Sequence, residues 1–310
     1  MSIQVLSHGK INLTLEVLYR RRDGFHQIET IMQEIGLADE ISLEELSPDP
    51  DCGGFKRGEI QLKCDHPLLP DGEKNLAYRA ASLFISKFAP GKSVKIELKK
   101  KIPVAAGLGG GSSNAAAVLK GLRSLWGIPV APEELLKLAA SLGSDVPFFL
   151  YGGTALAEGR GELISPAAAF PHTEVLLASP KNLQLSAAEV YQALLSEKLS
   201  PGNKTKAFLR ALEQEKGSRG STLTPFLPLL VNDLEEPAFS LQMDIKILKE
   251  RLSDMGLAPL MSGSGPTVFT LSENKKILSK ALQNLRADGY YAILTNTINN
   301  AESRMQNAEL

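Results

Sequence analysis

The chain has 310 residues, of which 34 are lysine or arginine and 35 are aspartate or glutamate, so its formal net charge at pH 7 is -1. This length can bury a substantial core and is typical of two domains. The even charge balance argues against nucleic acid, an anionic membrane surface or a polyanion as the main partner.

Cysteine content and apolar runs narrow the class of protein further. Cys52 and Cys64 allow at most one bridge and have no zinc-binding spacing, which favours reduced thiols in a cytoplasmic protein. The first residues lack the basic start and long apolar segment of a signal peptide. No apolar run reaches the ~18 residues of a spanning helix. We expect a cytoplasmic monomer or homodimer with no nucleic acid or membrane partner.

The N-terminal part alternates strand patterns with turns. Alternating apolar and polar residues predict strands at 3–6, 11–18, 27–35, 40–46 and 59–63. A helix is predicted over 75–88, and a further strand over 94–98 leads into a glycine-rich loop.

The glycine-rich loop covers residues 103–113, and apolar residues at helical spacing follow it from Asn114 to Trp126. Ser112 or Ser113 is expected to cap this helix, whose first N–H groups and dipole favour an anion such as phosphate. The loop lacks the lysine of a Walker A motif and the later acidic residue of a Rossmann fingerprint. Because the start of the helix favours an anion, nucleotide binding is the first hypothesis. The alternative is a glycine turn before an ordinary packed helix.

Sequence signals for a helix, a turn and a strand follow this region. A helix is predicted over 132–142, then a turn at 143–147 and an apolar strand at 148–151. Because Pro147 disfavours helix at Val146, Asp145 is expected in an extended or turn segment.

The C-terminal half has a different order of predicted elements. A strand is predicted at 175–178, a helix at 187–195, and a mobile surface excursion over the polar stretch 197–222. Strands at 257–262, 267–271 and 290–294 with a helix at 273–285 indicate a split α+β unit rather than a doubly wound sheet. Residues 299–310 are expected to be frayed.

Lys10 and Asp145 are the candidate catalytic pair. A phosphate-binding loop without its own lysine needs a positive charge from elsewhere, and Lys10, in Gly9-Lys-Ile-Asn12, can supply it. Phosphoryl transfer to an alcohol benefits from a carboxylate near the attacking hydroxyl, and a lysine beside them offsets charge in the transition state. The alternatives are an exposed strand lysine and an aspartate that caps a turn.

Three motifs resemble those of the galactokinase, homoserine kinase, mevalonate kinase and phosphomevalonate kinase superfamily. They are Lys10-Ile-Asn-Leu-Thr-Leu, the loop 103–113, and Met261-Ser-Gly-Ser-Gly-Pro-Thr267. Within it, the chain resembles the kinases of 4-diphosphocytidyl-2-C-methyl-D-erythritol. That likeness rests on Lys10-Ile-Asn12, Arg21-Arg-Asp-Gly-Phe-His26, the GlyGlyGlySerSerAsn form of the loop, and Gly143-Ser-Asp-Val-Pro147.

The resemblance implies an ATP- and Mg²⁺-dependent kinase that phosphorylates the 2-hydroxyl of this acceptor, giving the 2-phosphate and ADP, in non-mevalonate isoprenoid biosynthesis. It implies Lys10 and Asp145 as catalytic residues, and Asn12, Phe25 and His26 as acceptor-binding residues. It assigns ATP phosphates to Pro103, Val104, Ala105, Ala106, Gly107, Leu108, Gly109, Gly110, Gly111, Ser112 and Ser113, and a supporting third motif to Gly263, Ser264 and Gly265. No metal ligand is identified.

The implied fold class is α+β with two domains. An N-terminal domain of the ribosomal S5 domain 2-like type over 1–160 carries the nucleotide loop and the catalytic residues. A ferredoxin-like domain over 161–310 follows it. The rival hypotheses are another kinase of the superfamily and a non-catalytic metabolite sensor, and the presence of both Lys10 and Asp145 argues against the sensor.

The sequence departs from the family pattern near the acceptor residues. His8-Gly9 precedes the lysine where the family usually has Pro-Ala, so His8 is expected to be a packing or turn residue. Phe25 replaces a common tyrosine, which keeps stacking on cytosine but removes a hydroxyl. The second aromatic residue beside cytosine falls in the poorly matching region 180–191, where Tyr191 is the candidate.

Overall fold

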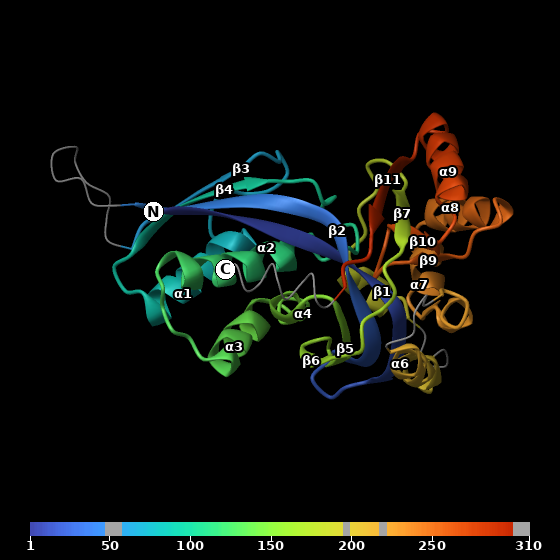
Figure 1. The fold of residues 1–310 in the computed structure, drawn as a ribbon, viewed down its shortest axis with the longest axis horizontal. Coiled ribbons are helices and arrows are strands. Elements are labelled where there is room, and N and C mark those ends of the chain that lie inside the picture. The colour runs from blue at the N-terminus through green and yellow to red at the C-terminus, as the bar shows by residue number, and fades with distance from the viewer. Residues whose placement is uncertain (47–57, 195–198, 217–221, 300–310) are drawn as a thin grey trace.

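The computed structural model describes residues 1–46, 58–194, 199–216 and 222–299. Figure 1 shows two packed parts, each with its own sheet and its own helices. The predicted α+β fold class is confirmed.

Two long strands organise the first sheet. β1 (Ser2–Arg20) pairs antiparallel with β2 (His26–Leu46) along nearly its whole length. The sequence predicted two strands in place of each. The register shifts at three points, one of them between His8 and Gly9, so a single strand bends there without ending. The bent pair therefore extends from the first part of the molecule into the second (Figure 1).

Strands join this pair on both sides. The order among the described strands is β3–β4–β2–β1–β8. β5 pairs with the first half of β2, and β6 pairs with β5. The other elements of this part are β3 (Ile60–Cys64), α1 (Leu76–Phe88), β4 (Ser93–Lys99), α2 (Gly110–Leu125), α3 (Pro132–Leu142), α4 (Phe148–Tyr151), β5 (Thr154–Gly159) and β6 (Leu163–Pro166).

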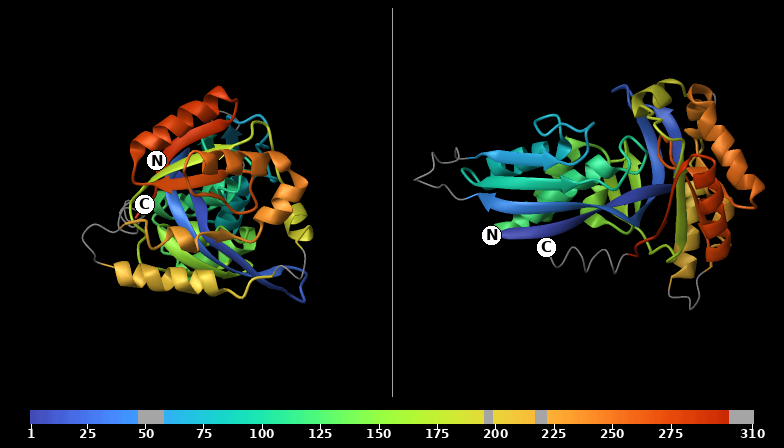
Figure 2. Two further views of the ribbon diagram at one scale, coloured as in Figure 1. Left: turned by 90° about the vertical axis from the view of Figure 1, so that its right-hand side faces the viewer. Right: turned by 90° about the horizontal axis from the view of Figure 1, so that it is seen from above.

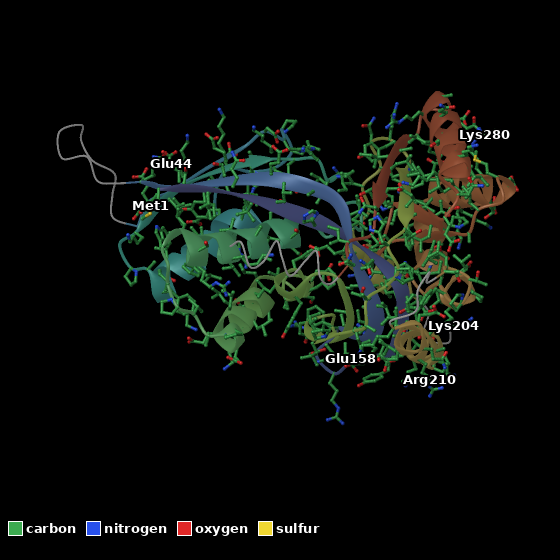
Figure 3. All side chains as sticks on the ribbon, in the orientation of Figure 1. Met1, Glu44, Glu158, Lys204, Arg210 and Lys280 are labelled. Atoms are coloured by element: carbon green, nitrogen blue, oxygen red, sulfur yellow. The ribbon has the colours of Figure 1, made fainter. Side chains whose placement is uncertain are left out.

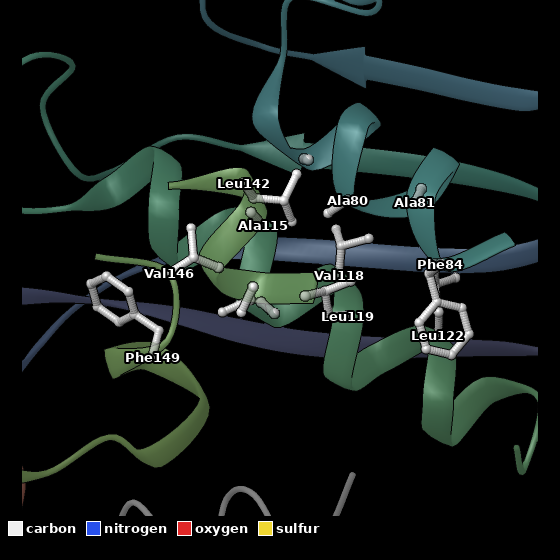
Figure 4. Close-up of a cluster of buried hydrophobic side chains, with 14 of the residues drawn as sticks. Ala80, Ala81, Phe84, Ala115, Val118, Leu119, Leu122, Leu142, Val146 and Phe149 are labelled. Carbon is white, nitrogen blue, oxygen red and sulfur yellow. The ribbon is translucent and has the colours of Figure 1, made fainter. Parts of the chain in front are cut away.

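Helices α1, α2 and α3 cover one face of the first sheet, and in the right-hand view of Figure 2 they lie behind its strands. Phe84 of α1, Val118 and Leu122 of α2, and Leu142 of α3 meet in the buried cluster of Figure 4. Apolar residues at helical spacing predicted α1 and α2 correctly, and Pro132 and Gly143 at its two ends predicted α3.

Residues 148–151 form the helical turn α4, so the predicted strand is wrong. Phe148 and Phe149 are both buried, and periodicity cannot separate a short buried strand from a short buried helix. Pro147 stands at the N-cap with helical backbone angles, and Gly152, at a φ of 66°, ends the turn.

The second part holds an antiparallel sheet in the order β11–β7–β10–β9. Its elements are β7 (Glu174–Ser179), α5 (Ala187–Gln192), α6 (Asn203–Glu215), the 3-10 turn η2 (Leu227–Leu229), β8 (Val231–Asn232), α7 (Glu235–Leu241), α8 (Met243–Asp254), β9 (Pro259–Met261), β10 (Val268–Ser272), α9 (Lys275–Ala287) and β11 (Tyr291–Asn296). Alternate residues of β7 face opposite cores: Leu176 packs with α8 and α9, and Leu177 packs with β1 and β2.

Helix α6 corrects the prediction of a mobile excursion over 197–222. Within the described residues of that stretch, Phe208 and Leu212 are buried and Phe208 packs against Phe170 and Phe226. The polar composition reflects its outer face, where Lys204 and Arg210 are exposed (Figure 3). Cys52 and the predicted frayed end beyond Asn299 lie outside the described residues, and Cys64 is a free thiol.

The first sheet crosses the predicted domain boundary at residue 160. β6 and β8 both belong to it, and Ile35 of β2 forms a bridge with Thr297. The boundary stays a prediction. In the part of the chain that the structure describes, no helix has the length and apolar character needed to cross a membrane.

Candidate active site

Lys10 lies on β1 with its side chain only 4% exposed. Its Nζ donates a hydrogen bond of 2.6 Å to Oδ1 of Asn12, the next residue on the same face of the strand. Nδ2 of Asn12 donates to Oγ1 of Thr30 on β2, at 2.8 Å, which turns the amide oxygen toward the lysine. A buried ammonium needs such partners, since an unpaired charge is costly in the interior.

Asp145 supplies the second partner of Lys10. It lies in the turn between α3 and α4, as predicted, and its Oδ2 is 3.5 Å from the lysine Nζ. The side chain of Asp145 is 31% exposed, so one side of the carboxylate contacts Lys10 and the other faces a cavity.

The glycine loop is tied to the lysine strand. The backbone N–H of Lys10 donates to the carbonyl of Leu108 at 2.9 Å. Gly107 has a φ of 75°, and a Cβ there would lie 2.1 Å from the carbonyl oxygen of Ser262. Gly109 has a φ of 70°, and a Cβ there would lie 3.1 Å from Cγ of Lys10. Only glycine fits both the backbone angles and the closeness of these neighbours.

The start of α2 differs from the prediction. Its N-cap is Gly109 and no side chain caps it, so the expected cap by Ser112 or Ser113 is wrong. The hydroxyl of Ser113 is buried and accepts a hydrogen bond of 2.7 Å from Ser7. Among the described residues no side chain caps α2, so its first N–H groups are available to an anionic ligand.

Asp39 anchors both ends of the loop. Its carboxylate is fully buried and accepts from the backbone N–H groups of Lys101 and Ile102, at 2.7 and 2.8 Å, where the loop begins. It also accepts from Nδ2 of Asn114, at 2.8 Å, and from Nζ of Lys100. Nothing in the sequence predicts this network, because an acidic residue in a strand carries no signal of burial.

The third motif contacts the loop from the second part of the molecule. Oγ of Ser262 donates to the carbonyl of Gly107 at 3.0 Å, and Gly263 and Ser264 line the cavity. Nδ2 of Asn232 donates to the carbonyls of Met261 and Gly263, at 2.7 and 2.8 Å. Because β8 pairs with β1, Asn232 holds the motif next to the lysine strand.

A cavity of about 820 Å³ connects these groups. At one end lie Lys10, Asp145 and, from the predicted ATP loop 103–113, Gly107 and Gly109. The other residues of 103–113 do not line it, and Ala106 and Leu108 are buried in the core beneath. His8 is buried, with Nδ1 3.2 Å from the carbonyl of Ile35, in line with a packing role.

Aromatic side chains form the other end of the cavity. The rings of His26 and Tyr191 stack with centroids 5.3 Å apart and planes 21° apart. Phe25 is 53% exposed, which excludes a core role, and the guanidinium of Arg160 lies 4.9 Å from its ring centroid. Arg160 is not among the site residues predicted from the sequence, although the Gly-Arg-Gly run at 159–161 signals a tight turn that could present it.

These rings are neutral near pH 7. Burial lowers the pKa of His26, and the charge of Arg20 acts in the same direction. Burial, together with the charges of Asp145 and Asp233, raises the pKa of Tyr191. The aromatic end therefore suits a flat, uncharged ring.

Comparisons with known proteins agree with this arrangement. Residues 75–153 match the GHMP kinases N terminal domain, and residues 208–290 match the GHMP kinases C terminal domain. A crystal structure of homoserine kinase from Cytophaga hutchinsonii shares the fold, with a TM-score of 0.72 at 17% identity over 96% of this chain and 94% of that one.

More similar relatives are 4-diphosphocytidyl-2-C-methyl-D-erythritol kinases. The protein of that name from Geobacillus kaustophilus is 42% identical over 92% of this chain and 93% of its own length. The one from Bacillus subtilis is 39% identical over 94% and 96%. A crystal structure of 4-(cytidine 5'-diphospho)-2C-methyl-D-erythritol kinase has a TM-score of 0.76 at 37% identity, over 95% of this chain and 99% of that one.

The fold and the paired lysine and aspartate beside a glycine loop define a GHMP kinase. Within that class, the chain belongs to the 4-diphosphocytidyl-2-C-methyl-D-erythritol kinase family.

Proposed function

We propose that the protein transfers the γ-phosphoryl group of ATP to the 2-hydroxyl of 4-diphosphocytidyl-2-C-methyl-D-erythritol, a step of non-mevalonate isoprenoid biosynthesis. The observation that carries the proposal is the contact of Lys10 with Asp145 on a cavity between the glycine loop and the aromatic end. Family membership supports the identity of the acceptor. Use of ATP supports a cytoplasmic location.

Asp145 acts on the attacking hydroxyl. Its exposed side faces the cavity, where the carboxylate accepts or orients the hydroxyl proton as the oxygen attacks phosphorus in line. Lys10 holds the carboxylate in place, and its charge offsets the negative charge that develops on the transferred group. Asn12 keeps the lysine directed at this point.

ATP phosphates bind at the loop and at the start of α2. Backbone N–H groups and the helix dipole stabilise anionic oxygens there, and the absence of side chains at Gly107 and Gly109 lets them approach. Gly263 and Ser264 close this end from the opposite side.

Magnesium accompanies ATP in this proposal. Magnesium is usually held by one or two carboxylates together with substrate phosphates, and when bound it neutralises charge on the phosphates. Asp145 is the carboxylate on the cavity among the described lining residues, and Ser112 lies in the first turn of α2. The carboxylate of Asp145 fits such an ion, whereas Ser112 does not line the cavity.

The acceptor occupies the aromatic end. Phe25, His26 and Tyr191 offer neutral rings to a cytosine base, and Asn12 lies nearer to Asp145 and the methylerythritol end. Because a homoserine or mevalonate acceptor has no base, this end of the cavity favours the cytidine-linked substrate over other acceptors of the superfamily.

ADP release with purified 4-diphosphocytidyl-2-C-methyl-D-erythritol tests the proposal, with homoserine and mevalonate as parallel acceptors and Asp145→Asn as the inactive control. The kcat/KM should be at least about 100-fold higher with the cytidine-linked acceptor than with the others, since a base adds about 1–3 kcal/mol of stacking and further polar contacts. Equal or faster turnover of homoserine or mevalonate would contradict the acceptor assignment, and no ADP release with any acceptor would favour the sensor.

A further inference from the structure

The turn between β5 and β6 lies along the cavity between its two ends. At Arg160 the turn contacts Phe25, with the guanidinium 4.9 Å from the ring centroid. One residue further, a Cβ at Gly161 would lie 3.7 Å from Oδ1 of Asp145. Arg160 is therefore placed between the ring at the aromatic end and the carboxylate at the reacting end.

Arg160 is oriented by the residue two places on. Its backbone N–H donates to Oε2 of Glu162 at 2.6 Å, and its Nε donates to Oε1 at 3.3 Å. Within the described chain, the terminal amino groups of Arg160 make no hydrogen bond, and its side chain lines the cavity at 34% exposure. Since a guanidinium has five N–H donors in a planar fork, those that point away from Glu162 can bind a ligand.

The charges on the cavity favour an anionic ligand at this position. Among its described lining residues, Lys10, Arg20 and Arg160 are cationic and Asp145 is the carboxylate. Lys10 contacts Asp145, and Arg160 contacts Glu162, which does not line the cavity. The cationic side chains that face the cavity nearer the aromatic end are therefore Arg20 and Arg160. A positive surface of this kind attracts and orients an anion.

We propose that Arg160 is a specificity-determining residue that binds the diphosphate between the cytidine and the methylerythritol of the acceptor. The inference rests on the proposed function, because the bridge of that acceptor must lie between Phe25 and Asp145. Arg160 acts in two ways: the face of its guanidinium stacks on Phe25, and its terminal amino groups donate to phosphate oxygens. Paired donation from arginine to a phosphate is strong and directional.

Binding of cytidine and of cytidine diphosphate to the wild-type protein and to Arg160→Met tests the proposal by calorimetry. Methionine keeps an unbranched apolar stem beside Phe25 but removes the charge and the donors. Loss of hydrogen bonds to a charged group should weaken cytidine diphosphate by about 10- to 100-fold and cytidine by less than about threefold. The matched control is Arg22→Met, which removes an exposed arginine from the same end without touching the cavity, and it should change neither affinity.

The ratio of the two affinities decides the question. If Arg160→Met weakens both ligands equally, the arginine only orients Phe25 and the diphosphate contact is overturned. If neither ligand is weakened, Arg160 has no role in binding. Arg160→Lys should recover part of the cytidine diphosphate affinity, since it restores the charge without the planar fork.

The KM values for the two substrates give a further test, because a general structural defect would change both of them. In Arg160→Met the KM for the acceptor should rise about 10- to 100-fold, while the KM for ATP stays within about twofold. The wild-type result separates the two proposals: no binding of cytidine diphosphate to the wild-type protein refutes the proposed function. Wild-type binding with an unchanged affinity ratio in Arg160→Met refutes only the role of Arg160.

Discussion

Lys10 and Asp145 meet across the fold, with Nζ of the lysine 3.5 Å from Oδ2 of the aspartate. The lysine is fixed by the pairing of β1 with β2, and the aspartate by the turn that joins α3 to α4. Their distance therefore depends on how α3 and α4 pack against the first sheet. A reaction that needs both groups makes that packing a requirement of catalysis.

Replacing the carboxylate tests its role directly. Asp145→Asn keeps the shape of the side chain but removes its charge and its ability to accept a proton. Because general-base catalysis contributes about 10²–10⁴-fold, kcat should fall by at least about 100-fold while ATP affinity is largely kept. Steady-state ADP release and nucleotide titration measure the two quantities. Retention of more than about a tenth of the wild-type kcat would show that Asp145 is not the base.

The glycine loop can be tested with a matched pair of glycines. Gly109 and Gly127 both have positive φ, at 70° and 59°, so alanine strains the backbone at each. Only at Gly109 would the new Cβ press on neighbours, namely Phe149 at 2.8 Å and Cγ of Lys10 at 3.1 Å. ATP affinity should fall at least about tenfold in Gly109→Ala, for a displacement that costs about 1.4 kcal/mol or more, and stay near wild type in Gly127→Ala. Equal affinities in the two variants would remove the loop from the nucleotide site.

Replacing Phe25 distinguishes a ring that stacks on the substrate from a ring that packs in the core. Since the ring is 53% exposed, Phe25→Ala should leave the melting temperature nearly unchanged. Loss of a stacked aromatic face is worth about 1–3 kcal/mol, so the KM for the acceptor should rise roughly 5- to 150-fold with little change for ATP. Phe25→Tyr should be neutral or slightly beneficial. A large drop in melting temperature with unchanged acceptor KM would mean that cytosine is held elsewhere.

Asp233 should give the stability a pH dependence. Burial, and to a smaller extent the charge of Glu16, raises the pKa of Asp233 to about 6, above its usual 3.8. Between those two values the folded protein holds the proton more tightly than the unfolded chain, so this group lowers stability as pH rises through that window. Asp233→Asn keeps an acceptor for the N–H of Val17 and removes the titration.

Thermal unfolding at pH 4.5 and 7 measures that effect. Relative to Asp233→Asn, the wild-type protein should lose stability between the two pH values. Asp254→Asn, which changes an exposed carboxylate on α8, should keep the wild-type slope. Identical slopes in the wild type and Asp233→Asn would show that Asp233 titrates near its unfolded value.

Asp39 should be the most stability-sensitive residue near the loop. Asp39→Ala removes the acceptor of two backbone N–H groups and leaves the nearly buried charge of Lys100 without its carboxylate. Breaking a buried pair in this way costs about 3–5 kcal/mol, which urea unfolding can measure. The double variant Asp39→Ala with Lys100→Met should recover part of the loss, because it removes the uncompensated charge. If the single variant is as stable as the wild type, the network does not anchor the loop.

The sequence predicted those features that depend on local patterns. Helical spacing identified α1 and α2, and the residues at its two ends identified α3. The three motifs identified the lysine strand, the loop and the family. The roles of the site residues stay predictions, although the structure brings Lys10, Asn12, Asp145 and the loop together.

Other features depend on contacts that sequence spacing does not encode. Arg160 faces the cavity only because β5 pairs with β2 and turns back over the hairpin that carries Phe25. Asp39 is buried only because the loop folds over it, and Tyr191 reaches His26 from a helix of the second part. Residues 148–151 were mistaken for a strand because four apolar residues fit either structure.

The two long strands have a consequence for cooperativity. The same pair lines more than one core: Leu43 of β2 packs with α1 and α2, whereas Leu15 and Val17 of β1 pack with α8 and α9. Neither core can melt without releasing strands that the other core needs, so the protein should unfold in one thermal transition, as single domains do. Fragments 1–160 and 161–310 would each lose part of a shared interior. A substitution that loosens α9 should therefore make amide protons of β1 exchange faster on the far side of the molecule.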